Sequence, residues 1–135
     1  MKLNPYIMYS GNAEEALNFY KKCLKGEIKD LGRYGDSTME SSEELKDKIM
    51  HARFIFDDNI IMVSDSHVAN ETTPGSNIQL SVDVPGADEL ESVFTQMSAG
   101  GKITMPLQDM FWGARFGMLT DKFGVKWMFN HELKK

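Results

Sequence analysis

Three histidines are the side chains in this sequence best suited to hold a metal ion or to move a proton near neutral pH. His51 stands in an apolar run, His67 in a polar segment, and His131 next to Glu132. No two of them are separated by two or four residues, the spacings that place paired ligands on one face of a strand or a helix. The pattern favours ordinary surface or hydrogen-bonded histidines over a metal site.

His51 and Asp65 are the candidates for catalysis without a metal ion. His51 shares a strand face with Arg53, so we expect it to meet Asp65, to contact a ligand, or to make a structural hydrogen bond. The run Ser64-Asp65-Ser66-His67 contains the residue types of a hydrolase triad. Because adjacent residues at a strand end point in different directions, they cannot line up as nucleophile, base and orienting group. Hydrolase chemistry is therefore not supported.

Cys23 is the only cysteine, so a disulfide within the chain is impossible. It stands beside Leu24 and three residues after Tyr20, on what we expect to be the packed face of a helix. The neighbouring lysines favour a thiolate only weakly, and no histidine is close in sequence. The pattern favours a buried structural cysteine over a nucleophile.

The elements that position these residues follow from the periodicity of the chain, which in the first half predicts one strand, one helix and three more strands. Apolar residues recur at helical spacing from Ala13 to Leu24, with Asn12 as N-cap and Gly26 as C-terminal stop. Ser41-Ser42-Glu43-Glu44 resembles a capping box that opens a short surface helix ending at Lys48. The expected strands are Pro5 to Tyr9, Glu27 to Tyr34, Ile49 to Phe56 and Ile60 to Ser64.

The second half repeats this order. A helix is expected from Ala87 to Ser98, and strands from Asn77 to Asp83, Lys102 to Leu107, Ala114 to Thr120 and Val125 to Asn130. Ala52-Arg53-Phe54 and Ala114-Arg115-Phe116 also match in letters. We therefore predict an α+β fold of two βαβββ modules in a single domain over residues 1–135, with modules at about 3–65 and 77–131 and a linker at about 66–76.

Composition excludes several classes of partner. The chain has 135 residues, 41% of them hydrophobic, and a net charge of −5 without a long basic run, so nucleic acid is not an expected partner. No stretch of about 18 apolar residues occurs, so no membrane association is expected. The sequence also lacks a secretory signal pattern, and we expect a cytoplasmic protein.

At this point the sequence resembles a known family. The motifs are Asn12 to Tyr20, Ile49-Met50-His51-Ala52, Ser64-Asp65, and the run from Phe111-Trp112-Gly113 through Thr120-Asp121-Lys122-Phe123-Gly124 to Trp127. They are similar to the PhnB-like branch of the vicinal oxygen chelate superfamily, which includes glyoxalase, bleomycin-resistance and extradiol dioxygenase proteins. The resemblance covers nearly the whole chain. It implies paired curved mixed sheets around a ligand cup, and subunits that often dimerise.

The resemblance also argues against a metal centre of the usual kind. Metal-using members hold a divalent ion with histidine and carboxylate ligands, and the corresponding positions here are Pro5, Asn77, Met62 and Met128. Proline offers no side-chain donor, and methionine offers only a thioether, which suits such an ion poorly. We therefore expect neither a metal ligand set nor a cofactor.

Aromatic and methionine residues suggest a ligand site instead. By the superfamily alignment Met128 faces the cup, so its neighbour Trp127 belongs to the core. An apolar concavity with a few polar groups is how proteins usually hold small molecules, and methionine makes such a lining pliable, although most of these residues would also suit an ordinary core. The predicted ligand-binding residues are Tyr9, Met62, Gln79, Trp112 and Met128.

Three functions remain open. The first is metal-free binding of a small, partly aromatic molecule. The second is a metal-independent enzyme that uses His51 or Asp65, with Tyr34 and Gln79 as further polar candidates. The third is a metal-dependent lyase, isomerase or dioxygenase with ligands at new positions. Nothing in the sequence resembles the Gly-rich loop of an S-adenosylmethionine site. Exposed strand edges lead us to expect a homodimer.

Overall fold

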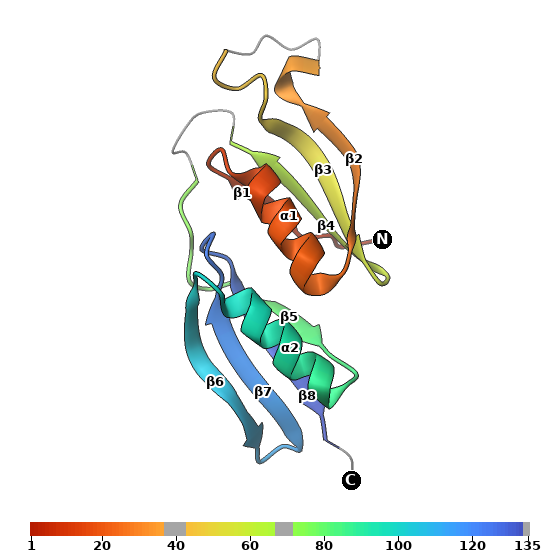
Figure 1. The fold of residues 1–135 in the computed structure, drawn as a ribbon, viewed down its shortest axis with the longest axis vertical. Coiled ribbons are helices and arrows are strands. Elements are labelled where there is room, and N and C mark those ends of the chain that lie inside the picture. Colours follow the sequence, from red (N-terminus) through yellow and green to blue (C-terminus); the bar gives the residue numbers. More distant parts are fainter. Residues whose placement is uncertain (37–42, 67–71, 134–135) are drawn as a thin grey trace. The chain divides into compact units, whose positions relative to one another are not determined.

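The structure is a computed structural model that describes residues 1–36, 43–66 and 72–133. It divides into two compact units, Met1–Thr73 and Pro74–Lys135, which we call module 1 and module 2. Each contains one long helix and one four-stranded sheet (Figure 1). The division falls inside the expected linker. His67, Ser41 and Ser42 lie outside the described residues.

Module 1 is a mixed sheet with one helix packed on it. Strand β1 is parallel to β4, whereas β4, β3 and β2 are antiparallel neighbours, which gives the order β1-β4-β3-β2. A parallel pair needs a long crossover, and helix α1 with the two intervening strands provides it. The elements are β1 (Tyr6–Tyr9), α1 (Ala13–Leu24), β2 (Glu27–Arg33), the 3-10 turn η1 (Tyr34–Asp36), β3 (Ile49–Phe56) and β4 (Asn59–Asp65).

Module 2 has the same topology, with the order β5-β8-β7-β6 and β5 parallel to β8. The α+β class and the repeated βαβββ order predicted from the sequence are therefore confirmed. No helix among the described residues is long and apolar enough to cross a membrane. The elements are β5 (Leu80–Asp83), α2 (Ala87–Ser98), β6 (Lys102–Met110), β7 (Ala114–Thr120) and β8 (Lys126–Glu132).

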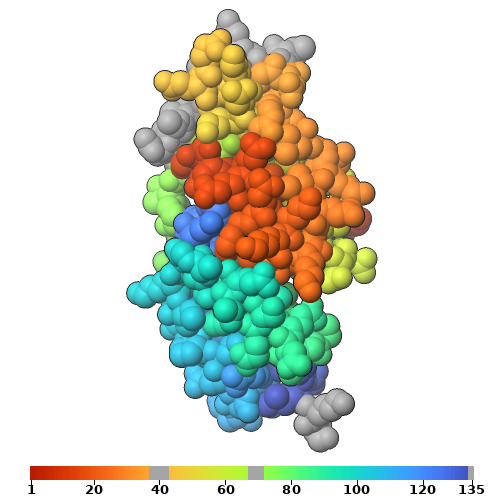
Figure 2. Space-filling model, in the orientation of Figure 1, coloured from red at the N-terminus to blue at the C-terminus, as the bar shows by residue number. Residues whose placement is uncertain are grey.

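In each module the helix covers one face of the sheet, and the core lies between them. Tyr20 of α1 meets Phe54 of β3 in module 1, and Phe94 of α2 meets Phe129 of β8 in module 2, with ring centroids 6.2 and 6.0 Å apart. The outer side of both helices is at the surface in the space-filling view (Figure 2). Because side chains alternate along a strand, the residues between these core positions point to the other face, which we call the open face.

Three local predictions were wrong. Residues 43–47 form a turn closed by Lys48 N donating to Leu45 O at 2.8 Å, not a surface helix. Helix α1 ends at Leu24, and its C-cap Lys25, not Gly26, takes the left-handed conformation that terminates it (φ 55°). Strand β5 begins at Leu80, so Asn77 precedes it.

Gly26 has a different role from the one predicted. A Cβ atom there would lie 2.5 Å from the carbonyl oxygen of Ile55 and 2.6 Å from the ring of Phe54. The residue is small because strand β3 passes close to the chain at that point.

Candidate functional site

The open face of module 2 carries a row of three methionines on neighbouring strands. Met128 lies between Trp127 and Phe129, which are both fully buried on the helix side, so its own side chain points to the open face. Met118 pairs with Met128 across β7 and β8, and Met105 pairs with Met118 across β6 and β7. All three side chains are half-buried. We call these three residues the methionine row.

The register of strand β6 completes this row. A register shift separates Met105 from Gln108. Leu107 lies on the helix side, because a Cβ atom on Gly117 would meet it at 2.9 Å and Phe94 of α2 at 2.8 Å. Residues that pair directly across a sheet share a face, so Met105 nevertheless stays beside Met118 on the open face. Sequence reasoning found Met128 but missed Met105, because strict alternation does not survive the bulge in β6. It also missed Met118, because local alternation does not show that this residue stands opposite Met128.

Aromatic side chains continue the apolar surface from the methionine row to the β6–β7 turn. Phe116 points to the open face, since its neighbour Gly117 is on the helix side. Trp112 lies edge-on to Phe116 with centroids 5.8 Å apart, and Phe111 lies edge-on to Trp112 at 5.1 Å. Trp112 is 52% exposed and Phe111 96% exposed. We call these three residues the hairpin aromatics.

Polar residues flank the methionine row on both sides. At one end Lys102, Thr120 and Lys126 pair across β6, β7 and β8. Toward the other end Asn130 pairs with Phe116, and its side-chain amide donates to Asp83 at 3.3 Å. The open face of module 2 thus combines a soft apolar centre with hydrogen-bonding groups at its margins, the pattern of a small-molecule site.

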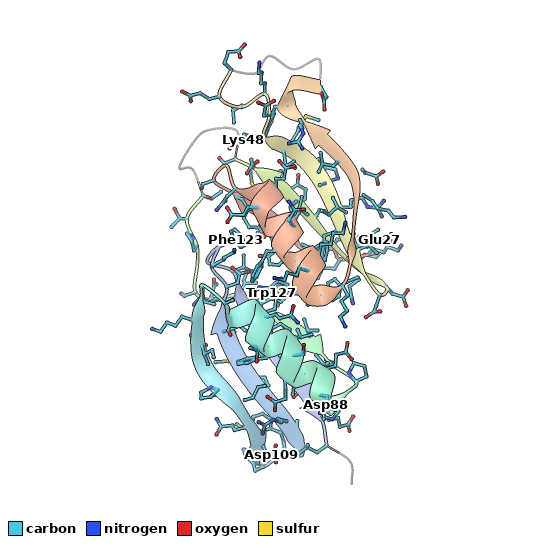
Figure 3. The ribbon with its side chains drawn as sticks, viewed as in Figure 1. Glu27, Lys48, Asp88, Asp109, Phe123 and Trp127 are labelled. Carbon is cyan, nitrogen blue, oxygen red and sulfur yellow. The ribbon has the colours of Figure 1, made fainter. Side chains whose placement is uncertain are left out.

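The two arginines matched in the sequence repeat occupy different environments. Arg53 lies on the open face of module 1 and pairs with Asp30 at 2.9 Å. Arg115 lies on the helix side of module 2, where it contacts Glu91 of α2 at 2.8 Å and Asp109 at 3.1 Å. Figure 3 labels Asp109 near the β6–β7 turn. The hydrogen bonds to these two carboxylates raise the pKa of Arg115. The matching Ala-Arg-Phe sequences therefore place their arginines on non-equivalent faces of the two sheets.

His51 also lies on the open face of module 1, where its partner is Tyr6. Nδ1 of His51 is 3.5 Å from the hydroxyl of Tyr6, and the two rings are 5.9 Å apart. In the same face Met62 pairs with both Tyr6 and Arg53. His51 is therefore held next to an exposed tyrosine, and the predicted candidate Met62 is beside the same ring.

Of the three alternatives expected for His51, the contact with Asp65 is wrong. Asp65 is 1% exposed and lies on the helix side of β4. One carboxylate oxygen accepts from the backbone N–H of Ala13 at 2.9 Å and the other from that of Ile49 at 2.8 Å. Asp65, not Asn12, therefore caps the N-terminus of α1. The carboxylate therefore has a structural role, since it joins the start of α1 to the start of β3.

The polar candidate Tyr34 also contacts Asp65. Its hydroxyl donates to the backbone oxygen of Asp65 at 2.8 Å. Burial, followed by the negative charge of Asp65, raises the pKa of Tyr34. Its proton is therefore held more firmly than that of an exposed tyrosine, which does not suit a general base.

The remaining predicted residues are spread over the two modules. Tyr9 is 3% exposed and donates its hydroxyl proton to Tyr20 on the helix side, so the expectation that it lines the open face is wrong. Gln79 is exposed and precedes β5. Cys23 is buried, and Nδ1 of His131 is 2.8 Å from the oxygen of Val84.

The four positions that the resemblance assigns to metal ligands do not fit a metal ion. The carbonyl oxygen of Pro5 accepts a hydrogen bond from the N–H of Met62 at 2.9 Å, and the side chain of Pro5 has no atom that can ligate a metal ion. Met62 and Met128 present thioethers, and Asn77 is exposed ahead of β5. Within the described ranges, no group of three or more His, Cys, Asp or Glu side chains could hold a metal ion.

Comparison with known proteins identifies the family. The model of the family described as 3-demethylubiquinone-9 3-methyltransferase matches residues 1–129. The chain belongs to this PhnB-like family. Protein YjdN of Escherichia coli strain K12 is 32% identical, over 96% of this chain and 95% of its own length.

Two similar solved structures agree with this assignment. The putative 3-demethylubiquinone-9 3-methyltransferase PhnB protein from Bacillus cereus is 31% identical over 97% of this chain and 99% of that chain, with a TM-score of 0.83. Protein PA1353 from Pseudomonas aeruginosa is 37% identical over 99% of both chains, with a TM-score of 0.90.

The fold is that of glyoxalase and bleomycin-resistance proteins. A glyoxylase/bleomycin resistance protein/dioxygenase domain from Frankia sp. EAN1pec has a TM-score of 0.71 over 99% of this chain and 93% of that chain. At 13% identity this likeness concerns the fold alone. The fold predicted from the PhnB-like motifs is therefore confirmed.

Proposed function

We propose that this PhnB-like protein binds a small, apolar, partly aromatic molecule on the open face of module 2, without a metal ion. The observation that carries the proposal is the methionine row, three half-buried thioether side chains in register on β6, β7 and β8. Their apolar surface continues into the hairpin aromatics.

The chemistry of these side chains supports this ligand class. Thioethers are polarisable and make favourable contacts with the edges and faces of aromatic rings. Phe116 and Trp112 already meet edge to face, so a further planar ring can join the same stack. Ser81, which pairs with Met128, and Asn130 place polar groups beside the row and can orient a ligand.

Truncation of one methionine tests the proposal. The probe is N-phenyl-1-naphthylamine, a neutral aromatic molecule whose fluorescence rises in apolar sites. Loss of about 40–50 Å² of contact area in Met105→Ala would weaken binding by about 1 kcal/mol, or fivefold. The matched control is Ile103→Ala, because Ile103 is on the same strand, pairs with the buried Leu119 and therefore belongs to the helix side.

Two outcomes contradict the proposal. The wild-type protein could leave the fluorescence of the probe unchanged. Alternatively, both variants could bind the probe as the wild type does, which would place the binding elsewhere.

The metal-free part of the proposal has its own measurement. Elemental analysis by plasma mass spectrometry, on protein without a histidine tag and after dialysis against metal-supplemented buffer, should give substoichiometric divalent metal. One bound ion per chain would instead support a metal-dependent lyase, isomerase or dioxygenase with ligands at other positions.

A second candidate function is a metal-independent reaction at His51. The Tyr6 hydroxyl 3.5 Å from Nδ1 of His51, on an open sheet face, is the observation that favours it. Turnover that survives chelators and disappears in His51→Ala would support this candidate. Unchanged turnover in His51→Ala would exclude it.

The proposal also includes a cytoplasmic homodimer. Strands β2 and β6 are sheet edges, which a partner chain or another segment can cover. Light scattering should give twice the 15.3 kDa of one chain, and a single 15.3 kDa species would contradict it. Cell fractionation tests the location.

A further inference from the structure

The open face of module 2 has an uncompensated positive end. Lys102 and Lys126 flank Thr120 on adjacent strands, and the ammonium group of Lys126 lies 3.4 Å from the Thr120 hydroxyl. We call Lys102 and Lys126 the lysine pair. The side chains of Thr120 and Lys126 point to the open face because their neighbours Leu119 and Trp127 are buried on the helix side.

The lysine pair differs from the arginines of the chain. Arg33, Arg53 and Arg115 each face a carboxylate at 3.1 Å or less. Within the described part of the chain, by contrast, neither Lys102 nor Lys126 has a carboxylate oxygen within 4.0 Å.

Asp121, the acidic residue nearest to Lys126 in sequence, makes its hydrogen bonds on the helix side of the sheet. The carboxylate of Asp121 accepts from the backbone N–H of Phe123 and of Val125 and from the indole N–H of Trp127. Trp127 is on the helix side, so this carboxylate does not neutralise the open face. In a chain of net charge −5, two lysines therefore give this end of the apolar row a local positive charge.

The spacing between the lysine pair and the aromatic rings follows from the strand. Thr120, Met118 and Phe116 are on the same face of β7, two residues apart. At about 3.3 Å per residue, the positive end lies about 7 Å from the methionine row and about 13 Å from Phe116. One elongated ligand can therefore touch all three parts.

We propose that the ligand of this face carries an anionic group, a carboxylate or sulfonate, held by Lys102 and Lys126 about 13 Å from an aromatic ring held by Phe116 and Trp112. The inference rests on the proposed function and names its ligand class. The ammonium groups and the Thr120 hydroxyl are the donors, and the methionine row contacts the apolar chain between the two ends.

The test compares two competitors that differ only in charge. They are 8-phenyloctanoate, whose extended chain spans a similar length, and its neutral primary amide. Each displaces N-phenyl-1-naphthylamine from the protein at low ionic strength. Two partly exposed lysines should make the acid bind about five- to tenfold more tightly than the amide. The difference should shrink in 1 M salt, where the screening length is about 3 Å.

Matched variants assign this difference to the lysine pair. In Lys102→Gln/Lys126→Gln the acid and the amide should compete equally, with affinity for the amide unchanged. Lys102→Arg/Lys126→Arg keeps the charge and should keep most of the difference. Lys122→Gln removes one equal charge from a side chain whose ammonium lies 5.4 Å from the Phe123 ring centroid, and it should also keep most of the difference.

The possible results separate the two proposals. If the wild-type protein binds the fluorescent probe but does not distinguish acid from amide, the inference is overturned and the proposed function stands. The inference is also overturned if the double glutamine variant still prefers the acid. If the probe does not bind at all, the proposed function fails, and the inference fails with it.

Discussion

Replacing Asp65 by asparagine should destabilise module 1 severely although it changes the side chain very little. The carboxylate is 1% exposed, and both of its oxygens accept backbone N–H groups, one at the start of α1 and one at the start of β3. An asparagine keeps one acceptor and turns an NH2 group toward the other backbone donor. Ala13 or Ile49 is then left without an acceptor.

The magnitude follows from these contacts. Loss of one charge-assisted hydrogen bond costs about 1.5–3 kcal/mol, and the buried donors that then face each other add about 1–2 kcal/mol. We therefore expect Asp65→Asn to lower the free energy of unfolding by about 3–4 kcal/mol, a large part of the 5–15 kcal/mol typical of a domain. The midpoint temperature should fall by about 10 °C.

The assay must report on module 1. Both tryptophans, Trp112 and Trp127, are in module 2, so urea unfolding should be followed by far-ultraviolet circular dichroism as well as by tryptophan fluorescence. Asp58→Asn is the matched control, because Asp58 is exposed in the turn before β4 and undergoes the same change of charge. A change of less than about 0.5 kcal/mol in Asp65→Asn, the range of an ordinary surface substitution, would refute the assigned role of Asp65.

Three further predictions concern other buried contacts. Asp121→Asn should destabilise module 2 by about 2–3 kcal/mol, measured by tryptophan fluorescence in urea, because the carboxylate joins the 121–125 turn to the buried indole of Trp127; a variant as stable as the exposed-site control Glu132→Gln would contradict this. Gly26→Ala should lower the midpoint temperature through the 2.5 Å approach to the oxygen of Ile55, whereas Gly75→Ala, where the new Cβ would approach the Asn77 side chain only to 3.9 Å, should not. The raised pKa of Tyr34 means that the folded state favours its neutral form. The resulting contribution of Tyr34 to the free energy of unfolding is present below the unfolded pKa of about 10 and is lost as pH rises through the folded pKa. The free energy of unfolding of Tyr34→Phe should therefore fall less between pH 9 and pH 11 than that of the wild type, and parallel curves would exclude the effect.

The sequence alone determined the elements whose signal is local. Helix α1 runs from Ala13 to Leu24 as its apolar spacing predicts, and α2 runs from Ala87 to Ser98. Strand β3 buries Ala52, Phe54 and Phe56 and leaves the residues between them accessible, as strict alternation requires. The same alternation correctly separated Trp127 from Met128.

The tertiary structure decided every feature that depends on a distant partner. Asp65 caps a helix that begins 52 residues earlier in the chain, and neither local propensity nor the suitable side chain of Asn12 indicates this. The methionine row depends on the register of three strands and on a shift within β6 that places Met105 and Leu107 on opposite faces. Arg53 and Arg115 share a local sequence but not a sheet face.

The physical reason is that periodicity reports how one element distributes its own side chains, whereas a site also needs the pairing of elements. The alternation of side chains along β7 indicates that Phe116, Met118 and Thr120 share a face. It does not indicate which residues of β6 and β8 stand opposite them. The hydrogen-bonded register of the sheet supplies that information: it sets Met105 and Met128 beside Met118, and Lys102 and Lys126 beside Thr120.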